Sequence, residues 1–193
     1  MGANQLDVIG FDPSSNGGTA WAHLRVGPSE RIYIERGELD DEAGIRTLLK
    51  GLALKPQPWI VGVEVVERGL NSRRGDEPGA RAKARSLIST AKVGEFIRAT
   101  ALAYGLAVEA MPVWVARKYV GLYGKTNDNV VKQALRAACP SWPRLSNDHV
   151  RDAAVVAIAA GTVYGIKTAW GSKIPQQAMV TESLVATRDS SGL

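Results

Sequence analysis

Two apolar stretches of the sequence each carry a carboxylate. Asp12 ends the run LDVIGFD that begins at residue 6, and Glu64 lies inside WIVGVEVV at residues 59–66. A turn explains Asp12 as readily as a functional role does, because Pro-Ser-Ser follows it. Glu64 has no such explanation, since an unpaired buried carboxylate is strongly unfavourable. Glu64 must therefore be protonated, paired with a cation or bound to a metal ion.

A third acidic segment lies near the end of the sequence, where Asp148, His149 and Asp152 precede the small-residue stretch AAVVAIAAG. In a helix, Asp152 lies about 40° from Asp148 and about 60° from His149 around the axis, so the three side chains share one face. Asp148 fits equally well as a helix N-terminal acid favoured by the helix dipole. Asp152 lies too deep in the helix for that role, and residues 153–160 are all apolar.

These acids predict a metal-dependent reaction if the fold brings them together. The expected cluster holds three acids, Asp12, Glu64 and Asp152, with His149 or Asp148 as a fourth member. Its carboxylates would repel one another strongly in a protein interior, so a cation must neutralise them. Carboxylate oxygens favour Mg²⁺ or Mn²⁺ over zinc. Two such ions roughly 3.5–4 Å apart activate a water and stabilise a leaving phosphate oxygen. The chemistry we expect is phosphodiester hydrolysis with two ions per site.

The elements that must position these acids follow from apolar spacing and turn residues. We expect strands at residues 6–11, 19–26, 31–38, 59–66 and 108–111, with tight turns between the first three. Helices are expected over 41–54 (with Asp40 as the N-cap), 80–104, 112–120, 129–138 and 147–164. Three antiparallel strands followed by strand-helix alternation predict an α/β protein. Its five-stranded mixed sheet, flanked by helices, is the ribonuclease H-like fold. In such a sheet the strands that carry Asp12 and Glu64 are neighbours.

The motifs around these acids resemble those of the RuvC family of Holliday-junction resolvases, in the ribonuclease H-like superfamily. The family's apolar-G-apolar-D-P-x-S motif is similar to IGFDPSS at 9–15, and its central-strand glutamate to VEVV at 63–66. Its C-terminal pattern, an Asp or His three residues before an Asp and an alanine-rich run, is similar to residues 149–159. The resemblance runs from about residue 6 to 163. The extra Arg/Gly-rich loop and the tail point to a divergent branch, either phage-encoded or from an unusual bacterium.

The resemblance implies a role for each acid. Asp12, Glu64 and Asp152 would hold the metals, and His149 falls at the family's third acidic position, where it would ligate a metal or assist the attacking water. Asp148 is the neighbour that could take its place. The implied activity is that of a divalent-metal-dependent, structure-selective DNA endonuclease that resolves four-way junctions. A homodimer would carry two such sites and cut two strands symmetrically.

The resemblance also bears on how DNA is bound. Arg117, Lys118 and Lys125 fall in the family's basic segment, where they would neutralise the scissile phosphate or hold the backbone. The family's aromatic wedge after the glutamate has no counterpart in ERGL at 67–70, so the preference among junctions, flaps and forks stays open. Residues Leu87, Ile88, Ala91, Phe96 and Ile97 of the expected helix 80–104 would form the dimer interface or pack in the core.

A basic segment follows the Glu64 strand. The chain has a net charge of +5 and a pI of about 9.5, and residues 68–92 hold seven basic residues against two acidic ones. A solvated helix face explains this segment as well as a nucleic-acid footprint does, by charge alone. Given the resemblance to the RuvC family, we expect the basic side chains of this segment to neutralise DNA phosphates along the route to the site. These DNA-binding candidates are Arg68, Arg73, Arg74, Arg81, Lys83 and Arg85.

Other functions remain open at this point. The same fold could cut forks, flaps or RNA–DNA hybrids, or could bind junctions without cutting if its acids only pair with arginine. Actin-like ATPases begin similarly but need two such domains, and 193 residues suit one. We expect a nuclease domain at 1–164 and a C-terminal extension at 165–193. The sequence shows no membrane-length apolar run and no signal peptide, and the single Cys139 excludes a disulfide framework. The expected location is the cytoplasm of a bacterial cell or phage-infected host, with an organelle as the alternative.

Overall fold

The centre of the protein is a five-stranded mixed sheet. The computed structural model describes residues 5–14, 18–56, 58–66, 80–123, 127–144 and 147–170, with the backbone alone at 80–83 and 169–170. The strands are β1 (Leu6–Asp12), β2 (Thr19–Val26), β3 (Arg31–Leu39), β4 (Trp59–Glu64) and β5 (Ala107–Met111), in the order β3-β2-β1-β4-β5. The pairs β1–β2 and β2–β3 are antiparallel, whereas β1–β4 and β4–β5 are parallel. The predicted mixed sheet is confirmed.

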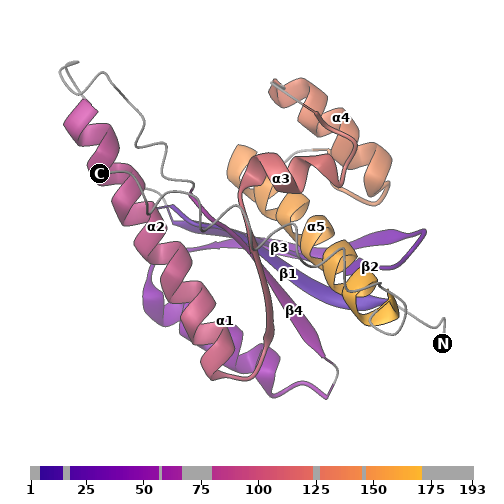
Figure 1. Cartoon of the computed structure of the whole chain (residues 1–193), viewed down its shortest axis with the longest axis horizontal. Helices are drawn as coiled ribbons and strands as arrows, with labels where there is room; N and C mark the ends of the chain where they lie inside the picture. Colours follow the sequence, from indigo (N-terminus) through magenta and orange to yellow (C-terminus); the bar gives the residue numbers. More distant parts are fainter. Residues whose placement is uncertain are drawn as a thin grey trace, which may run out of the picture.

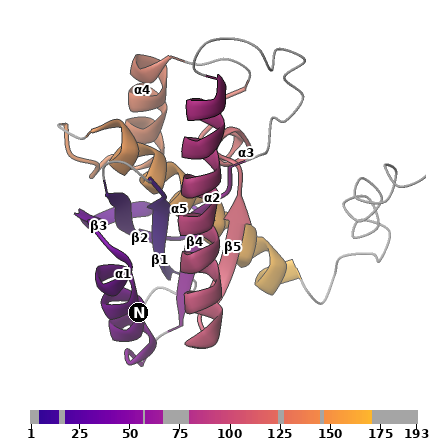
Figure 2. The same cartoon turned by 90° about the vertical axis from the view of Figure 1, so that its left-hand side faces the viewer.

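Helices cover both faces of this sheet (Figures 1 and 2). On one face lie α1 (Glu42–Ala53) and α2 (Ala80–Ala103). On the other lies α5 (Asp148–Trp170), packed along β1, β2 and β4, with α3 (Val113–Lys118) and α4 (Asp128–Ala138) against it. None of the helices described has the length and apolarity that a bilayer crossing requires.

Some element ends differ from the sequence-based expectation. Asp41, not Asp40, caps α1, because its extended backbone lets its side chain accept a hydrogen bond from Gly44 N at 2.8 Å. Strand β4 ends at Glu64, two residues before the predicted end, because its ladder with β5 stops at the pair Glu64↔Met111. Helix α5 runs to Trp170, six residues beyond the predicted end at Tyr164. Residues 171–193 of the expected extension lie outside the described residues.

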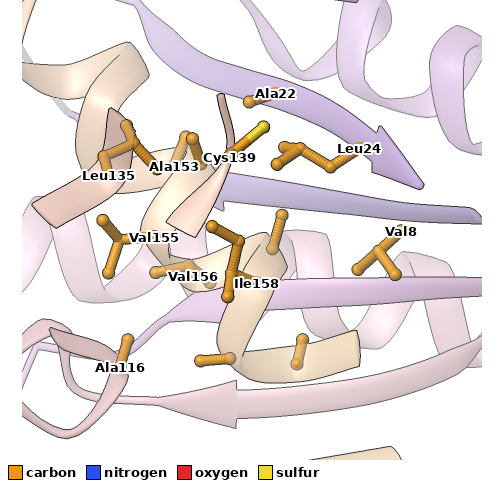
Figure 3. Close-up of a cluster of buried hydrophobic side chains, with 14 of the residues drawn as sticks. Val8, Ala22, Leu24, Ala116, Leu135, Cys139, Ala153, Val155, Val156 and Ile158 are labelled. Carbon is orange, nitrogen blue, oxygen red and sulfur yellow. The ribbon is translucent and has the colours of Figure 1, made fainter. Parts of the chain in front are cut away.

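Alternation along β1 and β4 divides the core into two clusters. Val8 and Ile60 point to α5, and Phe11 and Val63 point to α1 and α2. Figure 3 shows the cluster on the α5 side, where Val8 from β1 and Ile158 from α5 are both fully buried. Each such aliphatic side chain stabilises the fold by roughly 1.5–3 kcal/mol. Helix α5 is therefore held firmly on the sheet, and its first turn is fixed with it.

Two glycines set how closely α5 approaches the sheet. A Cβ on Gly10 would lie 2.1 Å from the carbonyl oxygen of Ala153, and one on Gly62 would lie 2.8 Å from the Cβ of Ala160. Gly10 and Gly62 face each other on β1 and β4, on the α5 side. Because alternate residues of a strand share a face, Asp12 and Glu64 also point to the α5 side.

We predict that Gly10→Ala destabilises the protein by about 1–3 kcal/mol, because the new methyl group must push α5 off the sheet. Gly51→Ala is the matched control, since nothing lies within 4 Å of a Cβ at that position in α1. There alanine should stabilise by about 0.5–1 kcal/mol through the helix backbone. Urea unfolding of both variants measures the difference. Equal stability of the two variants would show that α5 does not depend on the glycine contact.

Candidate active site

The parallel register of β1 and β4 places two acids side by side. The ladder between these strands ends at the pair Phe11↔Val63, and Asp12 and Glu64 are the next residues of each strand. A hydrogen bond joins their side chains. Both carboxyl groups are largely buried, on the face that α5 covers. The sheet itself therefore brings together the two acids that the sequence placed on separate strands.

The first turn of α5 adds the next members. Asn147 caps the helix by accepting a hydrogen bond from Val150 N at 2.8 Å, which fixes where the turn begins. His149 then places its Nδ1 2.8 Å from Oδ2 of Asp12. Asp152, one turn on, is close enough for its charge to act on Asp12, Glu64 and His149. The structure thus brings together Asp12, Glu64, His149 and Asp152, which we call the acidic cluster.

Burial, and then the crowding of like charges, perturb the pKa values of Asp12 and Glu64. Burial first, and then the negative charge of Asp12, raise the pKa of Glu64 to about 9. Burial also raises the pKa of Asp12, against the opposing effect of its hydrogen bond to His149. That same hydrogen bond raises the pKa of His149. At neutral pH the Glu64 carboxyl group therefore stays protonated and donates a hydrogen bond to Asp12, unless a cation binds between the two side chains.

A second cation stands against the cluster from α3. Arg117 places one guanidinium nitrogen 3.1 Å from each carboxylate oxygen of Asp152, in a largely buried contact. Its Nε is buried without a hydrogen-bond partner among the described residues. The guanidinium also lowers the pKa of Glu64 slightly, against the larger upward effects. His149 on Asp12 and Arg117 on Asp152 thus offset part of the negative charge.

The donor chemistry of the cluster fits a hard divalent cation. Three carboxyl groups with few neutralising partners are the ligands that Mg²⁺ and Mn²⁺ prefer. Within the described residues, however, no three His, Cys, Asp or Glu side chains are arranged to hold an ion as they stand. His149 and Arg117 each pair with a carboxylate that a metal ion would need. Metal binding would require these two side chains to move.

Asp148, the alternative fourth ligand, faces elsewhere. Its Oδ1 lies 2.7 Å from Arg151, which also approaches Asp128 of α4 at 3.2 Å. Arg151 is fully buried. His149, rather than Asp148, is therefore the side chain in contact with Asp12. Arg151 links α4 to the first turn of α5 and was not predicted from the sequence, although its spacing of three from Asp148 was a usable sign.

The candidate DNA-binding residues divide into three groups. Arg117 contacts Asp152, and Lys118 lies over the ring of Trp114, its Nζ 4.5 Å from the ring centroid. Arg85 is exposed on α2. The side chains of the other candidates lie outside the described residues: Arg68, Arg73, Arg74, Arg81, Lys83 and Lys125. The basic stretch is therefore described only in part, and its role in binding DNA stays a prediction.

Comparison with known proteins supports the fold. The sequence matches no protein-family model and no curated protein. Among solved structures, the fold is similar to RuvC of T. thermophilus in complex with a Holliday junction substrate. The TM-score is 0.57 at 15% identity, over 84% of this chain and 97% of that one. A second Thermus thermophilus RuvC structure gives 0.55 at 14% identity, over 86% and 97%. The α/β, ribonuclease H-like fold class is thus confirmed, and the likeness is one of fold.

We predict that Glu64→Gln stabilises the metal-free protein increasingly as pH rises. Because the folded pKa of Glu64 lies above its ordinary value, wild-type stability falls between about pH 4.5 and pH 9. The slope is at most about 1.4 kcal/mol per pH unit. Glutamine does not titrate, so this loss of stability disappears, and its amide can still donate a hydrogen bond to Asp12. Urea unfolding in EDTA at pH 5 and pH 8 measures the stability difference between the variant and wild type.

The matched control for this prediction is Glu95→Gln. Glu95 is an exposed glutamate paired with Arg98, which lowers its pKa. It should show no gain in stability at pH 8. A Glu64→Gln variant whose advantage over wild type is the same at both pH values would refute the crowding of the cluster.

Proposed function

We propose that the protein is a divalent-metal-dependent, structure-selective DNA endonuclease. It resolves four-way (Holliday) junctions by paired phosphodiester hydrolysis. The observation that carries the proposal is the convergence of Asp12, Glu64 and Asp152 on one end of the sheet, with His149 against Asp12. The likeness in fold to a RuvC that was solved with a Holliday junction substrate supports branched DNA as the partner.

In this proposal Asp12, Glu64, Asp152 and His149 hold Mg²⁺ or Mn²⁺, two ions per site. Such ions supply an activated water and stabilise the leaving oxygen. The residues of the chain prepare the site for them. The sheet fixes Asp12 beside Glu64, and burial keeps water away from both. Before a metal binds, His149 is hydrogen-bonded through Nδ1 to Asp12 and would leave this contact to ligate the ion. Arg117 supplies positive charge where a phosphate would approach.

Cutting two DNA strands in a paired way requires two copies of the site, so we propose that the protein is a homodimer. The exposed apolar residues Leu87 and Ile88 of α2 give such an interface a starting surface. Ile97, from the same expected interface, is instead fully buried in the core between α2 and the sheet, and Phe96 packs against that core. Work on cellular or phage DNA would take place in the cytoplasm of a bacterial cell or phage-infected host.

One observation favours a second candidate, a junction-binding protein that does not cut. Asp152 is already paired with Arg117, and no three donors stand ready for a metal among the described residues. If these pairs persist in the presence of Mg²⁺ and DNA, the cluster would be a structural charge network. The two candidates differ in whether cutting occurs, not in what is bound.

We predict that the protein cuts a synthetic four-way junction in Mg²⁺ or Mn²⁺. Asp12→Asn, Glu64→Gln and Asp152→Asn should each lower the cutting rate by about 100-fold or more, because each removes a metal ligand. Junction binding in EDTA should persist, since it does not need the ions. Glu42→Gln, an exposed acid of α1, is the control and should cut at the wild-type rate.

Gel assays on junction, flap, fork and RNA–DNA hybrid substrates of matched sequence measure both rate and preference. Binding of the junction with no cutting in either metal would favour the non-cutting protein. Faster cutting of flaps or hybrids than of junctions would keep the nuclease and replace the substrate. Wild-type rates in the three carboxylate variants would refute the acidic cluster as the catalytic site.

A further inference from the structure

Helix α3 presents three side chains on one face beside the acidic cluster. Trp114, Arg117 and Lys118 are spaced at i, i+3 and i+4, so they project from the same side of the helix. Arg117 reaches Asp152, which shows that this side borders the cluster. Lys118 Nζ lies 4.5 Å from the centroid of the Trp114 ring. An aromatic ring and two cations therefore stand together at the edge of the proposed nuclease site.

Trp114 lies on the exposed side of α3, away from the residues that anchor the helix. Ala116, which is fully buried, and Val115 anchor the helix to the core around α5. Trp114 remains 50% exposed. A lone exposed apolar side chain is ordinary on a protein surface. What sets Trp114 apart is the cation of Lys118 over its ring, together with Arg117 on the same helix face, which contacts an acid of the cluster.

This combination matches the chemistry of an unpaired nucleotide. Base–aromatic stacking tolerates any base, because every base has a π-face, and neighbouring cations neutralise the adjoining phosphates. A protein partner would be a weaker match, since one cation lies over the ring and a second projects from the same face of the helix.

We propose that Trp114 is a stacking platform for an unpaired base at the branch point of the DNA, with Lys118 and Arg117 binding the flanking phosphates. The inference rests on the proposed function and extends it, because it names a residue that would favour branched DNA over continuous duplex. Trp114 acts by binding and positioning the strand. In the proposed function, the acidic cluster carries out the hydrolysis.

The test measures binding without cutting. Fluorescence anisotropy in EDTA compares three labelled DNAs: a four-way junction with one unpaired adenine at the branch, the same junction with an abasic residue there, and a continuous duplex. Trp114→Leu should weaken binding to the adenine junction by roughly fivefold to a hundredfold. Trp114→Phe should retain most of the affinity. The loss should be much smaller on the abasic junction and absent on the duplex.

Tyr104→Leu is the matched control. Tyr104 is a similarly exposed aromatic that follows α2, at the opposite end of the sheet, where β5 begins beside Ile60. This variant should bind all three DNAs as wild type does. Circular dichroism of each variant checks that a loss of binding is not a loss of fold.

Several outcomes would overturn the platform. They are wild-type affinity of Trp114→Leu for the adenine junction, an equal loss on all three DNAs, and a changed oligomeric state with junction binding intact. The last would assign Trp114 to a protein contact. Failure of this inference is separable from failure of the proposed function. A wild type that cuts junctions while Trp114→Leu binds normally refutes the platform alone. A wild type that needs Trp114 to bind but never cuts refutes the nuclease alone.

Discussion

The burial of neighbouring carboxyl groups, which costs solvation and adds mutual repulsion, is the constraint on which the rest of the site depends. The register of β1 and β4 places Asp12 and Glu64 side by side, and α5 brings Asp152 close to both. Burial and mutual charge raise the pKa of Glu64 to about 9. His149 and Arg117 relieve part of this repulsion by pairing with Asp12 and Asp152. In the metal-free protein, a proton on Glu64 and the partners of Asp12 and Asp152 thus stand where a metal ion would otherwise supply positive charge.

Holding such a cluster together requires stability from elsewhere. Gly10 and Gly62 let α5 lie close on the sheet, and the apolar cluster around Ile158 fixes it there. Arg151, fully buried between α4 and the first turn of α5, ties that turn to Asp128. The rigid sheet and α5 therefore hold the cluster in place, and α3 brings the cations that could meet a phosphate.

Much of this was readable from the sequence, for physical reasons. A glutamate inside WIVGVEVV cannot be an ordinary strand residue, and acids at the ends of neighbouring strands must meet. The spacing of His149 and Asp152 set their common helix face. The pairing of Arg117 with Asp152 was not readable, because it depends on how α3 packs against α5. Arg151 and Trp114 escaped for the same reason, since their roles come from tertiary neighbours.

Isothermal titration calorimetry with Mn²⁺ tests most directly whether the acidic cluster binds a divalent cation. Wild type should take up Mn²⁺, and Glu64→Gln should bind it at least about tenfold more weakly, because one ligand of the cluster is neutral. Equal uptake of Mn²⁺ by the two proteins would contradict the account. The convergence of Asp12, Glu64 and Asp152 would then be a feature of the fold with no part in binding metal.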